Sequence, residues 1–437
     1  MSLIVALVLA VLVVVVLLAP QRWALLGMLA GALYLTQSQA VTVFGLNLFA
    51  IRLLEVAGFV RVMARGEFSF AHLNRIDQAL LLLYTFTPVV CWLRSADGIA
   101  YVVGVSTDAF LCYFTFRGLV GDMDNFRWFL RSFLLLLAPY AALVMVEALT
   151  HRSVFSFMGE GNYAWTREGR FRCVGSFRNA DLLGTLGAGF LPLYIGLAFI
   201  GRERRLACLG MALCLLLVWA SNSGGPLAAT AVGLVGWGLW RVRTQMRIVR
   251  RSMAAMIVLL ALLMQAPVWY LLARISGVTG GSGWHRSYLI DVALKHLGQW
   301  WLSGMPIMDT ADWFPYTVNS GADITNQYIG FGLTAGLGAI ALLCLVLKRS
   351  FSSLGKALEG ARSGSQVGGG NEFLLWGLGV MLAVHVANWF GITYFDQTYM
   401  IWFMQLATIS NLSAGPKVTV FAGEGNHGMV AAVASDE

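Results

Sequence analysis

Charged side chains are scarce in this sequence: Asp, Glu, Lys and Arg make up only 12% of its 437 residues, whereas 58% are hydrophobic. Soluble domains carry about 25% charged residues, so the chain has about half of the charge that a surface in water needs. The mean hydropathy of +0.72 agrees with this shortage. These values exclude a soluble enzyme, a nucleic-acid-binding module and a disordered scaffold, and they indicate a polytopic membrane protein.

Cysteine and histidine are also scarce, with six residues of each type. Five cysteines lie in apolar runs and only Cys173 falls in a loop, so the sequence supports neither a disulfide framework nor a metal site. We therefore expect no metal and no cofactor. The net charge of +8 indicates a bias in the loops rather than contact with nucleic acid, because no basic cluster lies on a soluble domain.

Long apolar runs dominate the chain, and a bilayer core needs about 20 apolar residues per helix. Thirteen runs are candidates: 2–19, 23–42, 44–62, 79–95, 100–117, 128–148, 180–200, 206–221, 225–240, 253–273, 326–347, 373–393 and 397–412. Since some runs are short, they predict an all-α membrane bundle of about 11 to 14 transmembrane helices.

Lysine and arginine are unevenly distributed between the two sides of this bundle. Twenty of the 30 fall on one side, which the positive-inside rule makes cytoplasmic. The other side then holds two long extracytoplasmic loops, at about 149–179 and 274–325. We expect residues 1–412 to form the membrane domain, with short amphipathic helices in the second loop, and 413–437 to be a cytoplasmic tail.

The first polar motif ends the first long loop and leads into a helix. Arg172 and Arg178 stand six residues apart there, and either Asn179 or Asp181 can cap the helix N-terminus. Gly175 permits a close approach of the backbone to a ligand. Guanidinium groups beside a helix N-terminus form an anion site suited to phosphate. The alternative is a loop whose arginines touch lipid headgroups.

Two further motifs lie on the same side of the bundle. The turn Asn222–Pro226, which contains Ser223, either only reverses the chain or offers backbone N–H groups to a phosphate. In the second loop, Arg286 precedes an amphipathic helix predicted over Leu289–Trp301, where it can bind an anion. Its neighbour His285 has no second histidine at metal-ligand spacing, which favours a surface histidine.

A fourth motif lies where the second loop re-enters the membrane. Asp323, Asn326, Gln327 and Tyr328 crowd together at the start of a glycine-rich span. The glycines allow close helix packing, and a polar helix cap accounts for part of this crowding. It does not account for the crowding of Asp323, Asn326 and Gln327 at membrane depth, which indicates a binding site.

Charges within the spans complete the inventory. Arg52 and Glu55 stand three residues apart in the third run, so we expect them to pair with each other or to face a polar cavity. His385, Asn388 and Asp396 flank the outer end of the penultimate span and can line the same cavity.

The order of these motifs resembles the O-antigen ligase/O-antigen polymerase family of multispanning bacterial envelope glycosyltransferases. The matching features are Arg-x-x-Gly-Ser-Phe-x-Asn-x-Asp at 172–181, the polar turn at 222–226, Arg286, Gly304-Met-Pro306, and Asn326-Gln-Tyr328 before a glycine-rich span. The resemblance covers roughly 165–340 by motif and the whole chain by hydropathy.

The resemblance implies a multi-pass protein of the bacterial inner membrane that acts on oligosaccharides linked to undecaprenyl diphosphate. It implies that Arg172 and Arg286, with Arg178 as a neighbour, hold the diphosphate. A flippase and a chain-length regulator of the same pathway are the implied partners, with the lipid bilayer. We therefore predict catalytic roles for Asp323, Arg172 and Arg286. Substrate contacts are predicted for Arg178, Asn179, Asp181, Ser223, Asn326, Gln327, Tyr328, Arg52 and His385.

The sequence departs from the ligase pattern at two positions. Thr325 stands where ligases have histidine, and a threonine hydroxyl is no general base near neutral pH. Ser223 is followed by Gly-Gly where many members have Arg-Gly. Both departures favour a polymerase of exopolysaccharide or O-antigen over a ligase that transfers glycan to lipid A-core. Asp323 is the nearest carboxylate to the missing histidine, and Asp181, Asp396 and His385 are rivals for the base.

Two alternatives come from other functional classes. A polysaccharide or lipid transporter also has many spans, but it is expected to show internal repeats and broken helices at mid-membrane. Here the polar residues concentrate in two outer loops, which favours an enzyme. A non-catalytic partner of an envelope polysaccharide assembly is the second alternative, because the expected histidine base is missing.

Overall fold

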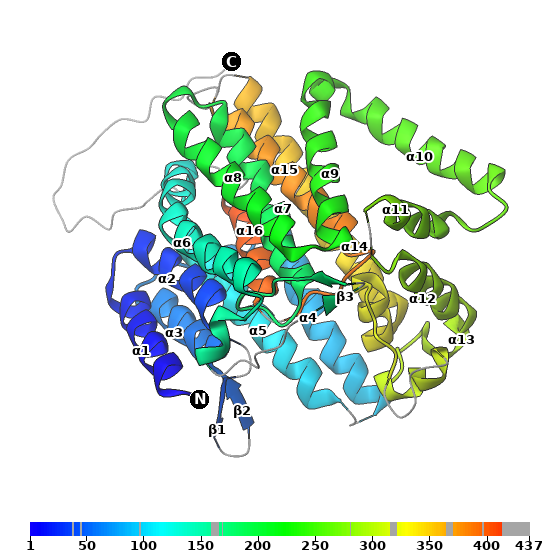
Figure 1. The fold of residues 1–437 in the computed structure, drawn as a ribbon, viewed down its shortest axis with the longest axis horizontal. Helices are drawn as coiled ribbons and strands as arrows, with labels where there is room; N and C mark the ends of the chain where they lie inside the picture. Colours follow the sequence, from blue (N-terminus) through cyan, green and yellow to red (C-terminus); the bar gives the residue numbers. More distant parts are fainter. Residues whose placement is uncertain are drawn as a thin grey trace, which may run out of the picture.

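The computed structural model is a bundle of α-helices (Figure 1). It describes residues 1–36, 39–43, 46–95, 98–158, 166–167, 169–279, 281–314, 321–363, 370–395 and 397–412. Within these residues the chain forms sixteen α-helices, six 3-10 helices and two small antiparallel hairpins. The predicted all-α class is confirmed. Asp396 and the predicted tail, 413–437, lie outside the described residues.

The elements have the following bounds. The α-helices are α1 (Leu3–Leu18), α2 (Gln21–Tyr34), α3 (Ala50–Ala64), α4 (Arg75–Arg94), α5 (Ile99–Leu119), α6 (Met123–Thr150), α7 (Ala180–Ala198), α8 (Arg204–Ser221), α9 (Gly224–Gly238), α10 (Met246–Leu263), α11 (Leu271–Thr279), α12 (Gly283–Lys295), α13 (Leu297–Trp300), α14 (Gln327–Arg362), α15 (Gly370–Asn388) and α16 (Thr398–Leu412). The 3-10 helices are η1 (Phe70–His72), η2 (Val154–Met158), η3 (Gly201–Glu203), η4 (Leu239–Gln245), η5 (Val268–Tyr270) and η6 (Ile307–Trp313). The strands are β1 (Ala40–Val43), β2 (Leu46–Phe49), β3 (Thr166–Arg167) and β4 (Arg170–Phe171).

The length and composition of the helices are those of a multi-pass membrane protein. Seven helical segments in the described residues are long and apolar enough to cross a bilayer: α4, α5, α6, α7, α8 with η3, α14 and α15. Gly224–Leu263 and Val268–Gly277 meet the same criteria together, bent by 98° at their junction, and would make an eighth span. Each of the thirteen predicted runs contains a helix, although several of these helices are shorter than the runs.

The second and third runs differ from the prediction. The sequence predicts helices over 23–42 and 44–62, but α2 ends at Tyr34 and a hairpin follows before α3. Its two strands are antiparallel, with Ala40 opposite Phe49. Hydropathy reports burial rather than backbone conformation, and the β-branched residues at 41–43 favour a strand. The helical prediction is therefore wrong over Ala40–Val43 and Leu46–Phe49.

The central helix of the bundle is α7. In its apolar window 89% of the residues are buried, against 39% in α4, α6 and α8. It packs against α8, α9 and α15 (Figure 1). Small residues make this possible: a Cβ on Gly187 would lie only 2.4 Å from the backbone oxygen of Cys214. The helix begins at a cap in which the Asn179 side chain accepts a hydrogen bond from the Asp181 N–H, so Asn179 is the cap.

The intramembrane charges pair differently from the prediction. Arg52 does not pair with Glu55; its Nε and Nη2 donate to the two oxygens of Asp108 on α5, at 2.5 and 2.6 Å. Glu55 accepts a hydrogen bond from the Tyr399 hydroxyl at 2.7 Å. A guanidinium fork matches a carboxylate best when both oxygens face it, and Asp108 offers that geometry from the neighbouring helix. Arg52 therefore belongs to the packing of α3 against α5.

The second long loop contains short helices, as predicted, with different bounds. The helix predicted over Leu289–Trp301 begins earlier, at Gly283, and breaks at His296 into α12 and α13. The break turns Trp300 inward, where it is buried and its Nε1 donates to the backbone oxygen of Ala293. α10 to α13 lie together along the right side of the view in Figure 1.

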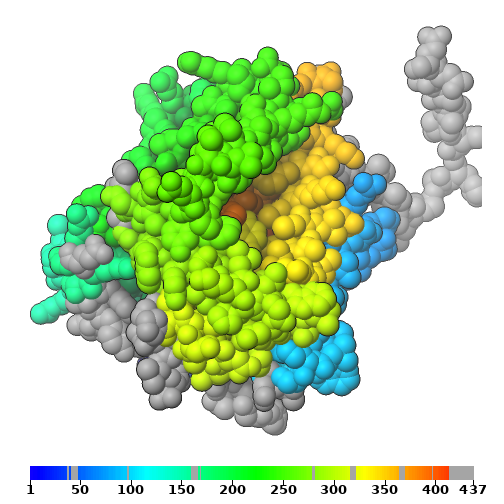
Figure 2. Space-filling view, turned by 90° about the vertical axis from the view of Figure 1, so that its right-hand side faces the viewer, coloured from blue at the N-terminus to red at the C-terminus, as the bar shows by residue number. Residues whose placement is uncertain are grey.

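The helix α10 has no buried residue along its length. Its apolar side chains, such as Leu262 at 78% exposure, face outward, which suits contact with lipid tails. Figure 2 shows a hollow beside it, between the green surface that includes α9 to α11 and the yellow and orange surface of α14 and α15. The side of the bundle with the second long loop is therefore hollowed.

Candidate anion site

Arg172, Arg286 and Asp181 meet at the N-terminal end of α7. Arg172 Nη2 lies 3.3 Å from Asp181 Oδ1, and Arg286 Nη2 lies 3.7 Å from Asp181 Oδ2. The two arginines come from different loops, and the sequence predicts that they converge on one ligand. Their guanidinium groups do meet, on one carboxylate of the protein itself. We call these three side chains the arginine cluster.

The polar turn at 222–226 also reaches the arginine cluster. Ser223 donates its hydroxyl hydrogen bond to Asp181 Oδ1. Ser223 is also the N-cap residue of α9, but its side chain makes no capping hydrogen bond there. The backbone N–H groups of Gly224 and Gly225, which open α9, are therefore not capped by this side chain. Such N–H groups are donors for an anion.

Three helix N-termini lie around the arginine cluster. Asp181 is in the first turn of α7, Ser223 precedes α9, and Arg286 is in the first turn of α12. A Cβ on Gly281 would lie 3.9 Å from the backbone of Gly224, so the starts of α9 and α12 are close neighbours. The N-terminal end of a helix carries a partial positive charge. The arrangement therefore adds helix dipoles to the two guanidinium charges.

The arginine cluster is short of negative charge. Arg172 and Arg286 are 14% and 11% exposed, yet they share one carboxylate. Within the described residues, the Nε of each is buried and has no hydrogen-bond partner. Burial lowers the pKa of Arg286 below its ordinary value, and Asp181 offsets this only in part. The charges of Arg167 and Arg172 lower this pKa further. A buried cluster of this kind is stabilised by a bound anion.

Backbone and amide groups form the walls of the site. A Cβ on Gly225 would lie 3.4 Å from Arg286 Nη2 and 3.7 Å from Asn388 Oδ1. A Cβ on Gly391 would lie 3.2 Å from Arg286 Nε. Asn388 is held in place because its Nδ2 donates to the Thr185 hydroxyl at 2.8 Å. The sequence predicts that Asn388 can line a cavity with Arg52 and Glu55, whereas the structure places it beside Gly225, next to the arginine cluster.

The motif at 323–328 lies between the second loop and the turn after α15. Asn326 caps α14 by accepting from the N–H groups of Tyr328 and Ile329. Gln327 Oε1 accepts from the Tyr394 N–H at 2.6 Å, and the Tyr328 hydroxyl donates to a backbone oxygen of α15 at 3.1 Å. Gln327 thus ties α14 to the turn that carries Gly391, and Tyr328 ties it to α15, which supports the wall behind Arg286.

Asp323, predicted as the base, is exposed and acts on Arg286 through its charge. Its backbone oxygen lies 3.2 Å from His285 Nε2, which places the predicted surface histidine beside it. The hydroxyl of Thr325 is buried without a hydrogen-bond partner in the described residues. Asp323 is therefore near the arginine cluster, while Asp181 is part of it.

Two other predicted site residues take different places. Arg178 is exposed and its guanidinium lies 5.9 Å from the centre of the Phe395 ring. His385 is fully buried, and its Nδ1 lies 2.5 Å from the Tyr394 hydroxyl. The His385 ring is therefore less accessible than the Asp181 side chain, which is 14% exposed.

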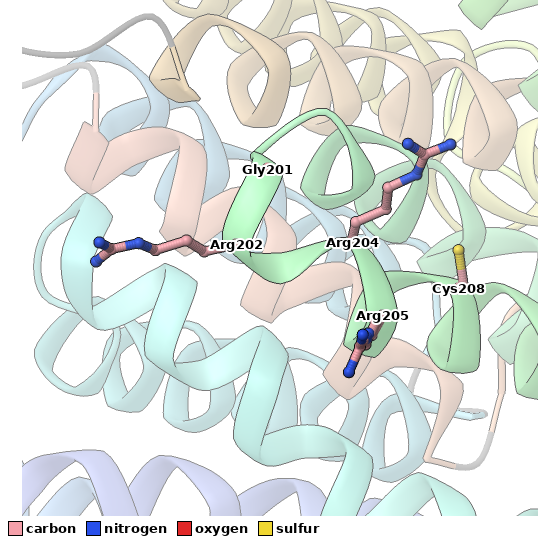
Figure 3. A pocket seen from close by; sticks show the side chains of 5 residues that line it. All are labelled: Gly201, Arg202, Arg204, Arg205 and Cys208. Carbon is pink, nitrogen blue, oxygen red and sulfur yellow. The ribbon is translucent and has the colours of Figure 1, made fainter.

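A separate hollow of about 670 Å³ lies at the connection between α7 and α8, where it is lined by Gly201, Arg202, Arg204, Arg205 and Cys208. The side chains of Arg202, Arg204 and Arg205 point in three different directions (Figure 3). They do not converge on one position, unlike the arginine cluster. This spread is typical of a basic loop on the cytoplasmic side of a membrane protein.

Sequence reasoning missed Arg167, whose charge acts on Arg286 from β3. The signal was present, because residues 166–172 contain three arginines in seven positions. In the described residues, no group of three or more His, Cys, Asp or Glu side chains is arranged to hold a metal ion. The chemistry that the site can perform is therefore built on guanidinium charges, helix N-termini and one carboxylate.

Compared with known proteins, the sequence matches no protein-family model and no curated protein. The fold and the arginine cluster are therefore what carries the functional argument.

Proposed function

We propose that this protein is a membrane glycosyltransferase that polymerises oligosaccharide repeat units carried on undecaprenyl diphosphate, giving an exopolysaccharide or an O-antigen. The observation that carries the proposal is the arginine cluster, in which two buried guanidinium groups from different loops share one carboxylate. Two such groups are suited to a ligand with more than one negative charge, and a diphosphate has that charge.

The chemistry of a lipid diphosphate donor fits this site. When the bond between the sugar and the diphosphate breaks, negative charge grows on the leaving oxygen. Arg172, Arg286 and the N–H groups that open α9 are the donors that stabilise this charge. Removal of one fixed donor of this kind lowers the rate of transfer by about 100- to 1,000-fold in enzymes that rely on it.

The hollow in Figure 2 supports a lipid-linked substrate. A polyprenyl chain stays in the bilayer while its diphosphate reaches the surface, so its binding site must open sideways to lipid. The hollow lies between α9–α11 and α14–α15, and α9 and α12 bring their first turns to the arginine cluster. We propose that the donor enters from this side, in the outer half of a bacterial inner membrane.

Polymerisation is preferred to ligation because Thr325 replaces the histidine of ligases. In the cell, the proposed partners are a flippase that delivers the donor and a regulator of chain length. The proposal is tested by measuring the sugars that are linked to the lipid carrier. Deleting the gene in its source organism should cause single repeat units to accumulate on the lipid carrier. Accumulation of long carrier-linked polymer would indicate a ligase, and an unchanged carrier pool would contradict both enzymes.

A further inference from the structure

We infer that Asp181 is the general base of the transfer, and that the diphosphate of the donor frees it by taking over Arg172 and Arg286. This inference rests on the proposed function. It replaces Asp323 as the predicted base. Asp181 contacts both arginines directly. Asp323 is exposed, and it is its backbone oxygen, rather than its carboxylate, that lies near His285.

Asp181 has the partners that a larger anion would have at this position. Arg172, Arg286 and Ser223 all converge on its two oxygens. This single carboxylate leaves the Nε of both arginines without a partner in the described part of the chain. A diphosphate has two phosphate groups and can engage both guanidinium forks, so it competes successfully with one carboxylate.

The backbone holds Asp181 at the site when its partners leave. Asp181 is in the first turn of α7, and its N–H is fixed by the cap residue Asn179 at 2.9 Å. α7 is also the most buried of the candidate spans. Once the diphosphate occupies the guanidinium groups, the carboxylate stands beside phosphate charges instead of cations. Its oxygens are then free to face the hydroxyl of the acceptor sugar.

The proposed step conserves atoms and charge. The hydroxyl of the acceptor sugar gives its proton to the Asp181 carboxylate, and its oxygen forms a bond to the anomeric carbon of the donor sugar. The bond between that carbon and the diphosphate oxygen breaks, and its electron pair leaves with undecaprenyl diphosphate. When this product departs, the Asp181 carboxyl releases its proton to water, and Arg172 and Arg286 return to the carboxylate.

The test uses the full-length protein with Asp181→Asn, which has nearly the same shape but cannot accept the proton. Polymer formation in the deletion strain should fall by about 100- to 10,000-fold, the usual contribution of a general base. Binding of inorganic pyrophosphate to the purified protein, measured by calorimetry, should stay as tight as in the wild type or become tighter, because the internal competitor is weakened. The matched control is Asp309→Asn, on an exposed part of η6 in the second loop, which should change neither measurement.

Each alternative gives a different result. If Asp181→Asn weakens pyrophosphate binding by about tenfold or more, Asp181 only positions the arginines, and the base assignment is overturned. Normal polymer formation by Asp181→Asn, or a larger loss with Asp323→Asn, would also overturn it. If the wild-type protein binds no pyrophosphate, the proposed function fails, and the role of Asp181 fails with it. If only the assignment of Asp181 as the base is wrong, the wild-type protein still binds pyrophosphate.

Discussion

Two arginine–aspartate arrangements in this protein use the same chemical groups in different ways. Between α3 and α5, Arg52 and Asp108 form a one-to-one pair in which two guanidinium nitrogens face two carboxylate oxygens at 2.5 and 2.6 Å. At the start of α7, Arg172 and Arg286 share Asp181 at 3.3 and 3.7 Å. The first arrangement is short and balanced, and the second is longer and has one carboxylate for two cations.

The difference separates a structural pair from the proposed binding site. In the Arg52–Asp108 pair, two guanidinium nitrogens each face one carboxylate oxygen, so the pair joins α3 and α5. In the arginine cluster, the Nε atoms of both arginines lack partners within the described residues, and the positive ends of helices surround them. Such a site gains energy when an anion enters.

The largest effect is expected from Arg172→Lys and Arg286→Lys. Lysine keeps the charge but cannot form the bidentate fork, so each variant should lower polymer formation by about 100-fold or more while the protein remains folded and inserted. The matched control is Arg178→Lys in the same loop, because Arg178 lies over Phe395 rather than on Asp181. Polymer formation is measured in the deletion strain. Equal losses of polymer in all three variants would show that the effect is not specific to the two arginines that contact Asp181.

Substitutions in the Arg52–Asp108 pair should lower the stability of the protein rather than its rate of polymer formation. Asp108→Leu leaves Arg52 without its carboxylate and should lower the free energy of unfolding by about 3 kcal/mol. The double variant Asp108→Leu with Arg52→Leu removes both charges and should recover most of this loss. Thermal unfolding in detergent measures both. A double variant as unstable as the single one would show that the pair has a role beyond mutual neutralisation.

A smaller loss is expected from Gly225→Ala. The added Cβ would be in ordinary contact with Arg286 and Asn388, at 3.4 and 3.7 Å, so the helix should fold normally. The methyl group would occupy space next to the arginine cluster, and polymer formation should fall by about tenfold, the cost of a modest displacement of the ligand. Gly238→Ala, at the other end of α9 with open space around it, is the matched control and should be unaffected.

The smallest effect is expected from Thr325→Ala. The Thr325 hydroxyl is buried and has no hydrogen-bond partner in the described part of the chain. Removing an unpaired buried hydroxyl costs little, so polymer formation should stay within about threefold of the wild type. A loss as large as that of Arg286→Lys would mean that Thr325 takes part in the transfer, and the comparison with ligases would then need revision.

The sequence predicts the helical class and singles out Arg172 and Arg286 because both depend on local features. Apolar runs reveal buried helices, and arginines near helix starts are recognisable: Arg172 precedes α7, and Arg286 is in the first turn of α12. The cap at Asn179 is one of two residues that the sequence proposes. These features need no knowledge of which segments are neighbours in space.

Features that depend on distant neighbours could not be predicted. Glu55 stands on the same helix as Arg52, so local spacing favours it, yet the partner is Asp108, 56 residues along the chain. The sharing of Asp181 between two loops likewise follows from the packing of α7 against α9. The hairpin at 40–49 was missed because apolar strands and apolar helices have similar hydropathy.

The most direct test of the central claim is the binding of inorganic pyrophosphate to the purified full-length protein, measured by calorimetry. The account predicts that the wild-type protein and Arg52→Lys bind it with the same affinity, since the Arg52–Asp108 pair takes no ligand. Arg286→Lys should bind it at least about tenfold more weakly, because the fork on the phosphate is lost. Equal affinity in all three proteins, or no binding by the wild type, would contradict the claim that the arginine cluster is the diphosphate site.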